Sequence, residues 1–359
     1  MKKFFLSLIL IALYIQADEK LIIADESDSL VSGSAENLKQ HDDEVYPIVI
    51  IGSGPAGMSA AIYAARAKID HVVIQGELGG QLMKASYLEN WPGSSSILGG
   101  ELAKDMENQT KQLGSKFIAD LVENVNFDVN PCEIKLTNNG VIKAYSIIIA
   151  TGIQRKKLKC PGEDKYLGAG IAVCAYCDAP LFQDKTVVVV GGGHSALKEI
   201  GIIKKYTNKI TLINNTSKLN APKMLTDYVT KDPAIKILSN CEVKEIMGDG
   251  QKATGVKIYN KATRKFFDLP ADGIFIAIGT KPNSGPFKEG LKRNKSGEIE
   301  VDCNGKTSKD GVFAAGDVSD KTHHQAVTAA AAGYACAMEA EKYLCSTTEC
   351  LEKRESLYH

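Results

Sequence analysis

The residues best suited to redox chemistry form one short segment, Cys174-Ala175-Tyr176-Cys177-Asp178. Two cysteines at this spacing can close a short disulfide, and a helix start lowers the pKa of a thiol, which favours the attacking thiolate. Asp178 adds a carboxyl group within reach, a candidate proton donor or acceptor for the second thiol. The segment therefore predicts a disulfide that opens and closes during catalysis, with Cys174, Cys177 and Asp178 as catalytic residues.

Zinc binding and a pair of inert thiols are the alternatives for this segment. A zinc site would require a second Cys or His pair at matching spacing, and His323-His324 is the one candidate for it. The chain has nine cysteines, but at 359 residues it is too long for a small fold stapled by disulfides. We therefore predict no metal site and favour the redox interpretation of the pair.

A glycine-rich turn near the start of the folded region predicts a nucleotide site. The β-branched run at residues 48–51 indicates a buried strand, and residues 58–68 are helix-forming. Glycines between them permit a tight turn, a close approach to a pyrophosphate and close packing of helix against strand, while the helix start offers free N–H groups. The predicted contact residues are Gly52, Ser53, Gly54, Pro55, Ala56 and Gly57.

The same pattern returns later in the chain. Residues 186–190 predict a strand, residues 197–206 a helix and residues 210–213 the next strand. One glycine turn alone is a weak signal, but two turns, each between a strand and a helix, indicate two nucleotide sites. The second set of predicted contacts is Gly191, Gly193, His194, Ser195 and Ala196.

Three strand ends marked by glycine suggest how the two units are joined. They lie at residues 147–152, 274–279 and 311–317, and Asp317 could hold sugar hydroxyls or cap a following helix. This order predicts an α/β fold with two Rossmann-like, three-layer nucleotide-binding domains, the second inserted into the first. The predicted domains are 45–154 with 284–344, and 155–283, the latter carrying the Cys pair.

The ends of the chain and its net charge limit its location and partners. The chain contains 43 basic and 43 acidic residues, so no basic excess attracts nucleic acid or an anionic membrane. Two lysines precede an apolar run at residues 4–15, which is shorter than the about 20 residues needed to span a bilayer. We predict a signal peptide (1–17), an acidic linker (18–44), a C-terminal tail (345–359) and export, with a cytoplasmic location as the alternative.

Several motifs together resemble low-molecular-weight thioredoxin reductases, from about Tyr46 to Leu344. The family's Cys-Ala-Thr-Cys-Asp motif corresponds to the Cys-Ala-Tyr-Cys-Asp segment here. Further similar segments are Gly79-Gly80-Gln81-Leu82, Glu89-Asn90-Trp91-Pro92-Gly93, Ala314-Ala315-Gly316-Asp317-Val318 and His324-Gln325-Ala326.

The resemblance implies that the outer domain binds FAD and the inserted domain a nicotinamide nucleotide. It also implies a homodimer and a domain rotation that presents the Cys pair to flavin and substrate in turn. Cys177 would face the flavin, and Cys174 would attack a thioredoxin-like or small disulfide substrate. Besides the first glycine turn, the implied FAD contacts are Gly80, Gln81, Leu82, Asn90, Thr151, Gly152, Gly316, Asp317, His324, Gln325 and Ala326.

The chain departs from the family where NADPH would be recognised. The family places basic residues after the second unit's strand to clamp the 2′-phosphate, whereas this chain has Asn214, Asn215, Thr216 and Asn220. Lys218 is a weaker phosphate ligand than arginine, and no Asp or Glu marks a preference for NAD. The nucleotide is therefore NADPH or NADH. His324 also replaces the family's Arg beside the flavin, and His194 replaces an Asn.

Three functions follow from these features. The first is a reductase that passes electrons from a nicotinamide nucleotide through FAD and the Cys pair to a disulfide. The second is an FAD-dependent dithiol oxidase that uses oxygen, which the absent clamp and the signal peptide favour and the second glycine turn disfavours. The third is a redox-silent flavin-binding protein, which the Cys-x-x-Cys-Asp segment opposes.

Overall fold

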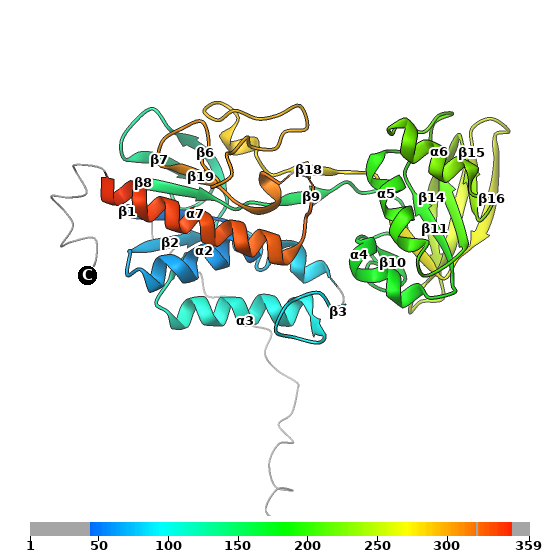
Figure 1. The fold of residues 1–359 in the computed structure, drawn as a ribbon, viewed down its shortest axis with the longest axis horizontal. Coiled ribbons are helices and arrows are strands. Elements are labelled where there is room, and N and C mark those ends of the chain that lie inside the picture. The colour runs from blue at the N-terminus through cyan, green and yellow to red at the C-terminus, as the bar shows by residue number, and fades with distance from the viewer. Residues whose placement is uncertain (1–43, 86, 321, 347–359) are drawn as a thin grey trace, which may run out of the picture. The chain divides into compact units, whose positions relative to one another are not determined.

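The computed structural model describes residues 44–85, 87–320 and 322–346. Its largest sheet has seven strands, with β1 and β8 at its centre (Figure 1). Strands β5, β2, β1, β8 and β19 are parallel, while β7 and β6 extend the sheet in antiparallel fashion. The strands are β1 (Val45–Ile51), β2 (His71–Ile74), β5 (Lys116–Ile118), β6 (Val122–Asn126), β7 (Cys132–Leu136), β8 (Val141–Ile149) and β19 (Val312–Ala314).

This sheet is buried on both faces, which is why its central strands are continuous apolar runs. Ile48 and Ile50 of β1 pack against the alanine-rich helices α2 (Pro55–Arg66) and α7 (Ala326–Ser346). Val49 and Ile51 point to the opposite core. Helix α3 (Gly99–Gln112) packs beside α2 (Figure 1).

A second, fully parallel sheet lies between β8 and β19 in the sequence, in the order β10-β17-β11-β12-β13. Its strands are β10 (Ile171–Ala172), β11 (Thr186–Val190), β12 (Lys209–Ile213), β13 (Ile235–Leu238) and β17 (Gly273–Ile276). Helices α5 (His194–Ile203) and α6 (Lys223–Lys231) share a core with one face of this sheet. The other face packs on an antiparallel sheet of β14 (Cys241–Gly248), β15 (Ala253–Asn260) and β16 (Lys265–Pro270).

Two short antiparallel strands, β9 (Ile153–Arg155) and β18 (Thr280–Pro282), carry the chain out to the second sheet and back (Figure 1). Because β8 and β19 are neighbours in one sheet, the predicted insertion of one Rossmann-like unit into the other is confirmed. The remaining elements are β3 (Tyr87–Leu88), β4 (Ile97–Leu98), α4 (Ala175–Asp178), η1 (Gly80–Lys84), η2 (Ala179–Phe182), η3 (Gly285–Phe287) and η4 (Gly316–Val318).

Both helices that follow a glycine turn begin three residues earlier than predicted. Helix α2 begins at Pro55 rather than Met58, and α5 begins at His194 rather than Leu197 and ends at Ile203 rather than Tyr206. Apolar periodicity does not register the first helical turn, whereas Pro at the first helical position is favourable because that N–H has no partner within the helix.

The predicted signal peptide (1–17), most of the acidic linker (18–44) and most of the tail (345–359) lie outside the described residues. Within the described part of the chain, no helix combines the length and the apolar character needed to cross a membrane.

The contact between α2 and α7 requires a glycine. A Cβ atom on Gly333 of α7 would overlap the backbone carbonyl of Ala56 in α2. By contrast, a Cβ on Gly201 of α5 would meet no described atom within 4 Å outside its own helical turn.

We therefore expect Gly333→Ala to lower the free energy of unfolding by about 1–3 kcal/mol, because α7 must move away from α2. The control Gly201→Ala should raise it by up to about 1 kcal/mol, since alanine favours a helix over glycine. Urea unfolding followed by circular dichroism measures both values. An unchanged midpoint for Gly333→Ala would contradict this account of the packing.

Candidate active site

Two glycines of the first glycine turn have no room for a Cβ atom, and the third faces free space. Gly52 has φ 115° and donates its N–H to Ile74 O at 2.9 Å, and a Cβ on it would overlap Ala150 O. A Cβ on Gly57 would overlap Gly52 O. At Gly54, however, the nearest atom to such a Cβ is Gly79 O at 3.9 Å. The free space therefore lies at Gly54, where a ligand can approach the backbone.

The start of α2 faces this space without a competing negative charge. Gly54 is its N-cap residue, Pro55 stands in the first turn, and that turn carries no acidic side chain. The free N–H groups of a helix start attract anions, so this end of α2 suits a pyrophosphate. Ser53 is buried and donates its hydroxyl to Glu77 O at 3.1 Å, which fixes the loop that follows β2.

Segments that are far apart in the sequence meet at this turn. Gly79 donates its N–H to Ser53 O at 3.1 Å, and a Cβ on Gly80 would lie 3.9 Å from the Cα of Gly54. Gly316 has φ 72°, and a Cβ on it would lie 3.0 Å from the Cβ of Ala56. The structure thus brings the predicted segments around residues 52–57, 79–82 and 314–318 together.

Asp317 lies beside this turn, inside η4. Helix α7 begins only at Ala326, so Asp317 does not cap it. Burial raises the pKa of the Asp317 carboxyl, while the charges of His324 and Arg155 act in the opposite direction. A carboxyl at the carboxyl end of β19 is placed as expected for a residue that binds sugar hydroxyls.

Three predicted contacts hold the base of the β9–β18 ribbon. Thr151 donates its hydroxyl to Asn283 O at 2.9 Å, and Asn283 donates its side-chain amide to Thr151 O at 2.8 Å. Gly152 has φ 65° and accepts the N–H of Asn283 at 3.0 Å. Gln81 donates its side-chain amide to Ile153 O at 3.1 Å. These residues therefore fix the point where the chain leaves the first sheet.

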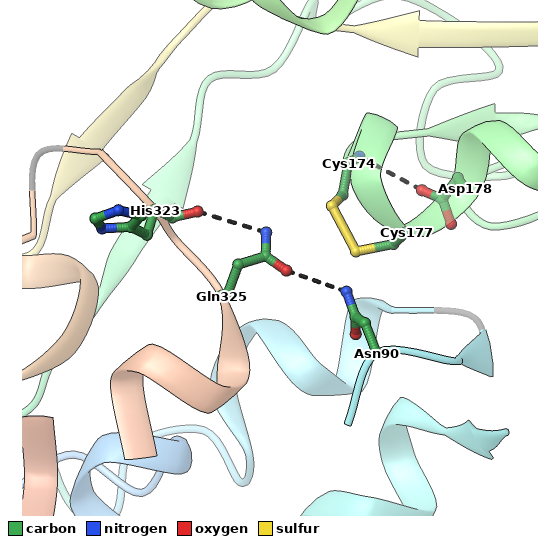
Figure 2. The surroundings of a disulfide bond; sticks show 6 residues. All are labelled: Asn90, Cys174, Cys177, Asp178, His323 and Gln325. Carbon is green, nitrogen blue, oxygen red and sulfur yellow. Dashed lines mark hydrogen bonds between the residues drawn. A yellow bond between two sulfur atoms is a disulfide. The ribbon is translucent and has the colours of Figure 1, made fainter. Parts of the chain in front are cut away.

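The remaining predicted flavin contacts lie near the start of α7. Asn90 donates its side-chain amide to the Gln325 Oε1 atom at 3.2 Å, which joins two predicted segments (Figure 2). His324 has φ 48°, and its Nε2 donates to Asp320 O at 3.0 Å because a carbonyl oxygen can only accept. Leu82 and Ala326 belong to one apolar cluster with Met58.

The Cys174–Cys177 disulfide is formed, with 5.3 Å between the Cα atoms. Cys174 is the N-cap residue of the one-turn helix α4, and its N–H donates to the Asp178 Oδ2 atom at 3.4 Å (Figure 2). Asp178 is buried. Cys177 packs against the apolar cluster that contains Leu82 and Ala326. The disulfide therefore lies against the segments predicted to line the flavin.

The second glycine turn repeats the design of the first. Gly191 has φ 138° and donates its N–H to Ile213 O at 2.9 Å, and a Cβ on it would overlap Ala277 O. Gly193 is open, since its nearest neighbour would be Asn220 O at 4.0 Å. His194 and Ser195 are exposed in the first turn of α5, and Ala196 is buried. This turn can also receive an anion.

Asn214 closes the loop where the phosphate clamp was expected. It is buried, and its amide nitrogen donates to Thr216 O at 2.9 Å and Lys218 O at 3.0 Å. Its Oδ1 atom accepts the Thr216 hydroxyl at 3.1 Å. A Cβ on Gly192 would overlap the Asn214 amide. Asn214 therefore shapes the loop, while Asn215, Thr216, Lys218 and Asn220 are exposed.

Two charged residues beside the redox pair were missed by the sequence analysis. Arg155 lies at the end of β9, and Glu199 lies on α5 among the buried residues Ala196, Ile200 and Ile203. Burial lowers the pKa of Arg155 and raises the pKa of Glu199 to about 7. A signal was available, since Glu199 occupies the apolar stripe of its helix.

Among the residues that the structure describes, no group of three or more His, Cys, Asp or Glu side chains is placed to hold a metal ion.

The chain belongs to the family of pyridine nucleotide-disulphide oxidoreductases, whose pattern it matches over residues 46–348. Within this family it is an FAD-dependent disulfide oxidoreductase of the thioredoxin reductase type. The family implies FAD and a nicotinamide nucleotide as cofactors.

The similar proteins cover nearly the whole described chain. The thioredoxin reductase of Rickettsia conorii is 40% identical over 302 residues, which are 83% of this chain and 97% of that protein. The thioredoxin reductase of Listeria monocytogenes is 37% identical over 314 residues, 87% and 98% of the two chains. The structure of the Streptococcus pyogenes thioredoxin reductase has a TM-score of 0.81 at 34% identity and covers 85% of this chain and 100% of its own.

These findings confirm the predicted family, fold class and enzyme class. The domain boundaries and the roles of individual residues stay predictions.

We expect Asn214→Ala to lower the free energy of unfolding by about 1–3 kcal/mol, because the Thr216 carbonyl loses its side-chain donor and the Lys218 carbonyl keeps only the Thr216 hydroxyl. Asn215→Ala, at the exposed neighbouring position, is the control and should change it by less than about 0.5 kcal/mol. Urea unfolding measures both values. Equal effects would show that Asn214 does not hold the loop.

Proposed function

We propose that the chain is a thioredoxin-disulfide reductase, which passes electrons from a nicotinamide nucleotide through FAD and the Cys174–Cys177 disulfide to thioredoxin or a similar disulfide. The observation that carries this proposal is the packing of Cys177 against the cluster that contains Leu82 and Ala326. In the proposal, residues 45–154 and 284–344 form the FAD-binding domain, and residues 155–283 bind the nicotinamide nucleotide.

FAD fits the outer domain. The space at Gly54 and the free N–H groups of α2 suit its pyrophosphate, and Asp317 suits a sugar hydroxyl. The residues proposed around the flavin are Gly80, Gln81, Leu82, Asn90, Thr151, Gly152, His324, Gln325 and Ala326. When bound, FAD would serve as the two-electron carrier.

The chain's own residues handle the sulfur chemistry. Reduction of the disulfide adds two electrons and two protons, which leaves Cys174 and Cys177 as thiols. Cys174 gives up its proton and attacks the substrate disulfide, which forms a mixed disulfide and releases one substrate thiol. Cys177 then attacks Cys174, restores the disulfide and releases the second thiol. Asp178, which accepts the N–H of Cys174, is the proposed proton donor and acceptor.

The nicotinamide nucleotide is proposed to bind at Gly191, Gly193, His194, Ser195 and Ala196, with little preference between NADPH and NADH. Asn214 is occupied in closing its own loop, and Asn215, Thr216 and Asn220 carry no charge. Lys218 is exposed and offers one point charge rather than a guanidinium fork.

An FAD-dependent dithiol oxidase is the second candidate, because the missing phosphate clamp favours a donor other than NADPH. In this case, electrons would pass from a substrate dithiol through the Cys pair and FAD to oxygen.

A homodimer and export complete the proposal. Tyr63 of α2 and Tyr334 of α7 are exposed with 4.6 Å between their ring centroids, and they give the first domain an apolar surface for a second copy. Sedimentation at the monomer mass would contradict the dimer. Export rests on the N-terminal sequence alone, and detection of the full-length chain only in the cytoplasm would support the alternative location.

Anaerobic flavin absorbance distinguishes the two candidate functions. In the reductase, NADH and NADPH should both bleach the flavin of the FAD-loaded chain, with Kd values within about tenfold of each other. Gly193→Val should weaken both by at least about tenfold, because its side chain enters the open space at the start of α5. Gly201→Ala is the control. Bleaching by a dithiol alone, with the colour returning in air, would indicate the oxidase.

A trapping experiment tests the order of the cysteines. Cys177→Ser should accumulate a mixed disulfide between Cys174 and an added thioredoxin, because the resolving thiol is gone. Cys174→Ser should accumulate at least about tenfold less, and the exposed Cys303 provides the control Cys303→Ser. Non-reducing electrophoresis and peptide mass spectrometry identify the adduct. Trapping at Cys177 instead would reverse the assignment.

A further inference from the structure

Three charged groups lie together beside the redox pair. Helix α4, which ends at Asp178, packs against α5, which carries Glu199. Arg155 arrives from the end of β9, and the charges of Asp178, Glu199 and Asp317 all act on it. Asp317 belongs to the FAD-binding domain in the proposal above, whereas Glu199 and Asp178 belong to the inserted unit.

The carboxyl of Glu199 is in an unusual position. Its Oε2 atom is shielded from solvent and has no hydrogen-bond partner among the described residues. A shielded carboxylate oxygen without a hydrogen-bond partner is costly when charged, so the protonated form is favoured. Burial and the charge of Asp178 raise the pKa of Glu199 to about 7, although Arg155 opposes the shift. Glu199 therefore changes its charge near neutral pH, next to the redox motif.

The other elements packed against α5 bring few competing charges. Strand β11 and helix η2 contain no titratable side chain, and on α5 itself His194 and Lys198 are exposed. The titratable residues of α6 are Lys223, Asp227, Tyr228 and Lys231. The neighbouring charges that shift the pKa of Glu199 are those of Arg155 and Asp178.

We propose that Glu199 and Arg155 are positioning residues that govern when Asp178 holds a proton, and thereby when the Cys174 sulfur reacts as a thiolate. The proposal rests on the roles of Cys174 and Asp178 in the proposed function. An ionised Glu199 makes a negative charge on the neighbouring Asp178 unfavourable, so Asp178 retains its proton. A charged Arg155 favours the ionised form of Asp178. On reduction, the Cys174 sulfur receives its proton from this carboxyl group, and it returns the proton when it attacks the substrate disulfide.

The test measures the pH dependence of Cys174 alkylation in the FAD-loaded full chain after reduction by a dithiol and its removal under nitrogen. Peptide mass spectrometry separates Cys174 from Cys177. Glu199→Gln should lower the midpoint pH by about one unit, because it removes the negative charge that forms above pH 7 and opposes the thiolate. Arg155→Met should raise the midpoint by a similar amount, because it removes a positive charge that favours the thiolate.

Two controls separate this effect from a structural one. Glu245→Gln removes a partly exposed carboxylate that pairs with Lys257 at 3.0 Å, and it should leave the midpoint unchanged. Arg155→Lys keeps the charge and should restore a midpoint close to that of the wild type. Each variant is checked for FAD content and circular dichroism, and Glu199→Gln carries the test if Arg155→Met does not fold.

Infrared spectroscopy gives a second readout that does not depend on turnover. A protonated carboxyl band should disappear as the pH rises through about 7, and it should be absent in Glu199→Gln. Shifts of the alkylation midpoint in the same direction in Glu199→Gln and Arg155→Met, or no shift in either, would overturn the proposal. Failure of Cys174 to reduce thioredoxin would overturn the proposed function instead, since alkylation reports Cys174 without a protein substrate.

Discussion

The pairing of β8 with both β1 and β19 is the constraint on which the rest of the structure depends. Ile147, Ile148 and Ile149 pair with β1 on one side and with Val312–Ala314 on the other. The chain must therefore leave the sheet after β8 and return at the neighbouring position. Residues 156–279 are attached through β9 and β18, and Thr151 and Asn283 join the base of these two strands by reciprocal hydrogen bonds. The inserted unit is thus connected through one narrow ribbon.

The same ribbon carries a charge that links the two units. Arg155 ends β9, and its charge acts on Asp178 and Glu199 of the inserted unit and on Asp317 near the first glycine turn. Burial lowers the pKa of Arg155. Negative charge in its surroundings is therefore needed to keep the guanidinium in its charged form. A movement of one unit against the other would change how this charge is shared between Asp317 and the two inserted carboxyls. In the proposal above, the proton of Asp178 would therefore depend on the geometry of the ribbon.

Local patterns were sufficient to predict most of the fold. Short β-branched runs identified the central strands, and the two glycine turns identified the ends of β1 and β11. The antiparallel sheet β14–β16, which covers the second parallel sheet, was not predicted because residue spacing does not show which elements pack on which face. Glu199 was missed for a similar reason. A charged residue on a helix is usually solvated, and the apolar stripe of α5 does not by itself show that the Glu199 Oε2 atom is shielded from solvent.

Asn214 stands where the family has a basic residue, and in the structure it holds its own loop together. From the sequence alone, this residue marks the loss of a basic clamp. In the structure, its amide satisfies two backbone carbonyls and its side chain fills the space above Gly192, which only a glycine leaves free. Position 214 therefore has no room for a larger side chain unless the loop is rebuilt. The Thr216 hydroxyl takes part in the same hydrogen-bonded loop, whereas the exposed side chains of Asn215 and Asn220 lie outside it. The loop can thus hold its shape through Asn214 whichever nucleotide the exposed residues contact, which separates the stability of this region from its choice of nucleotide.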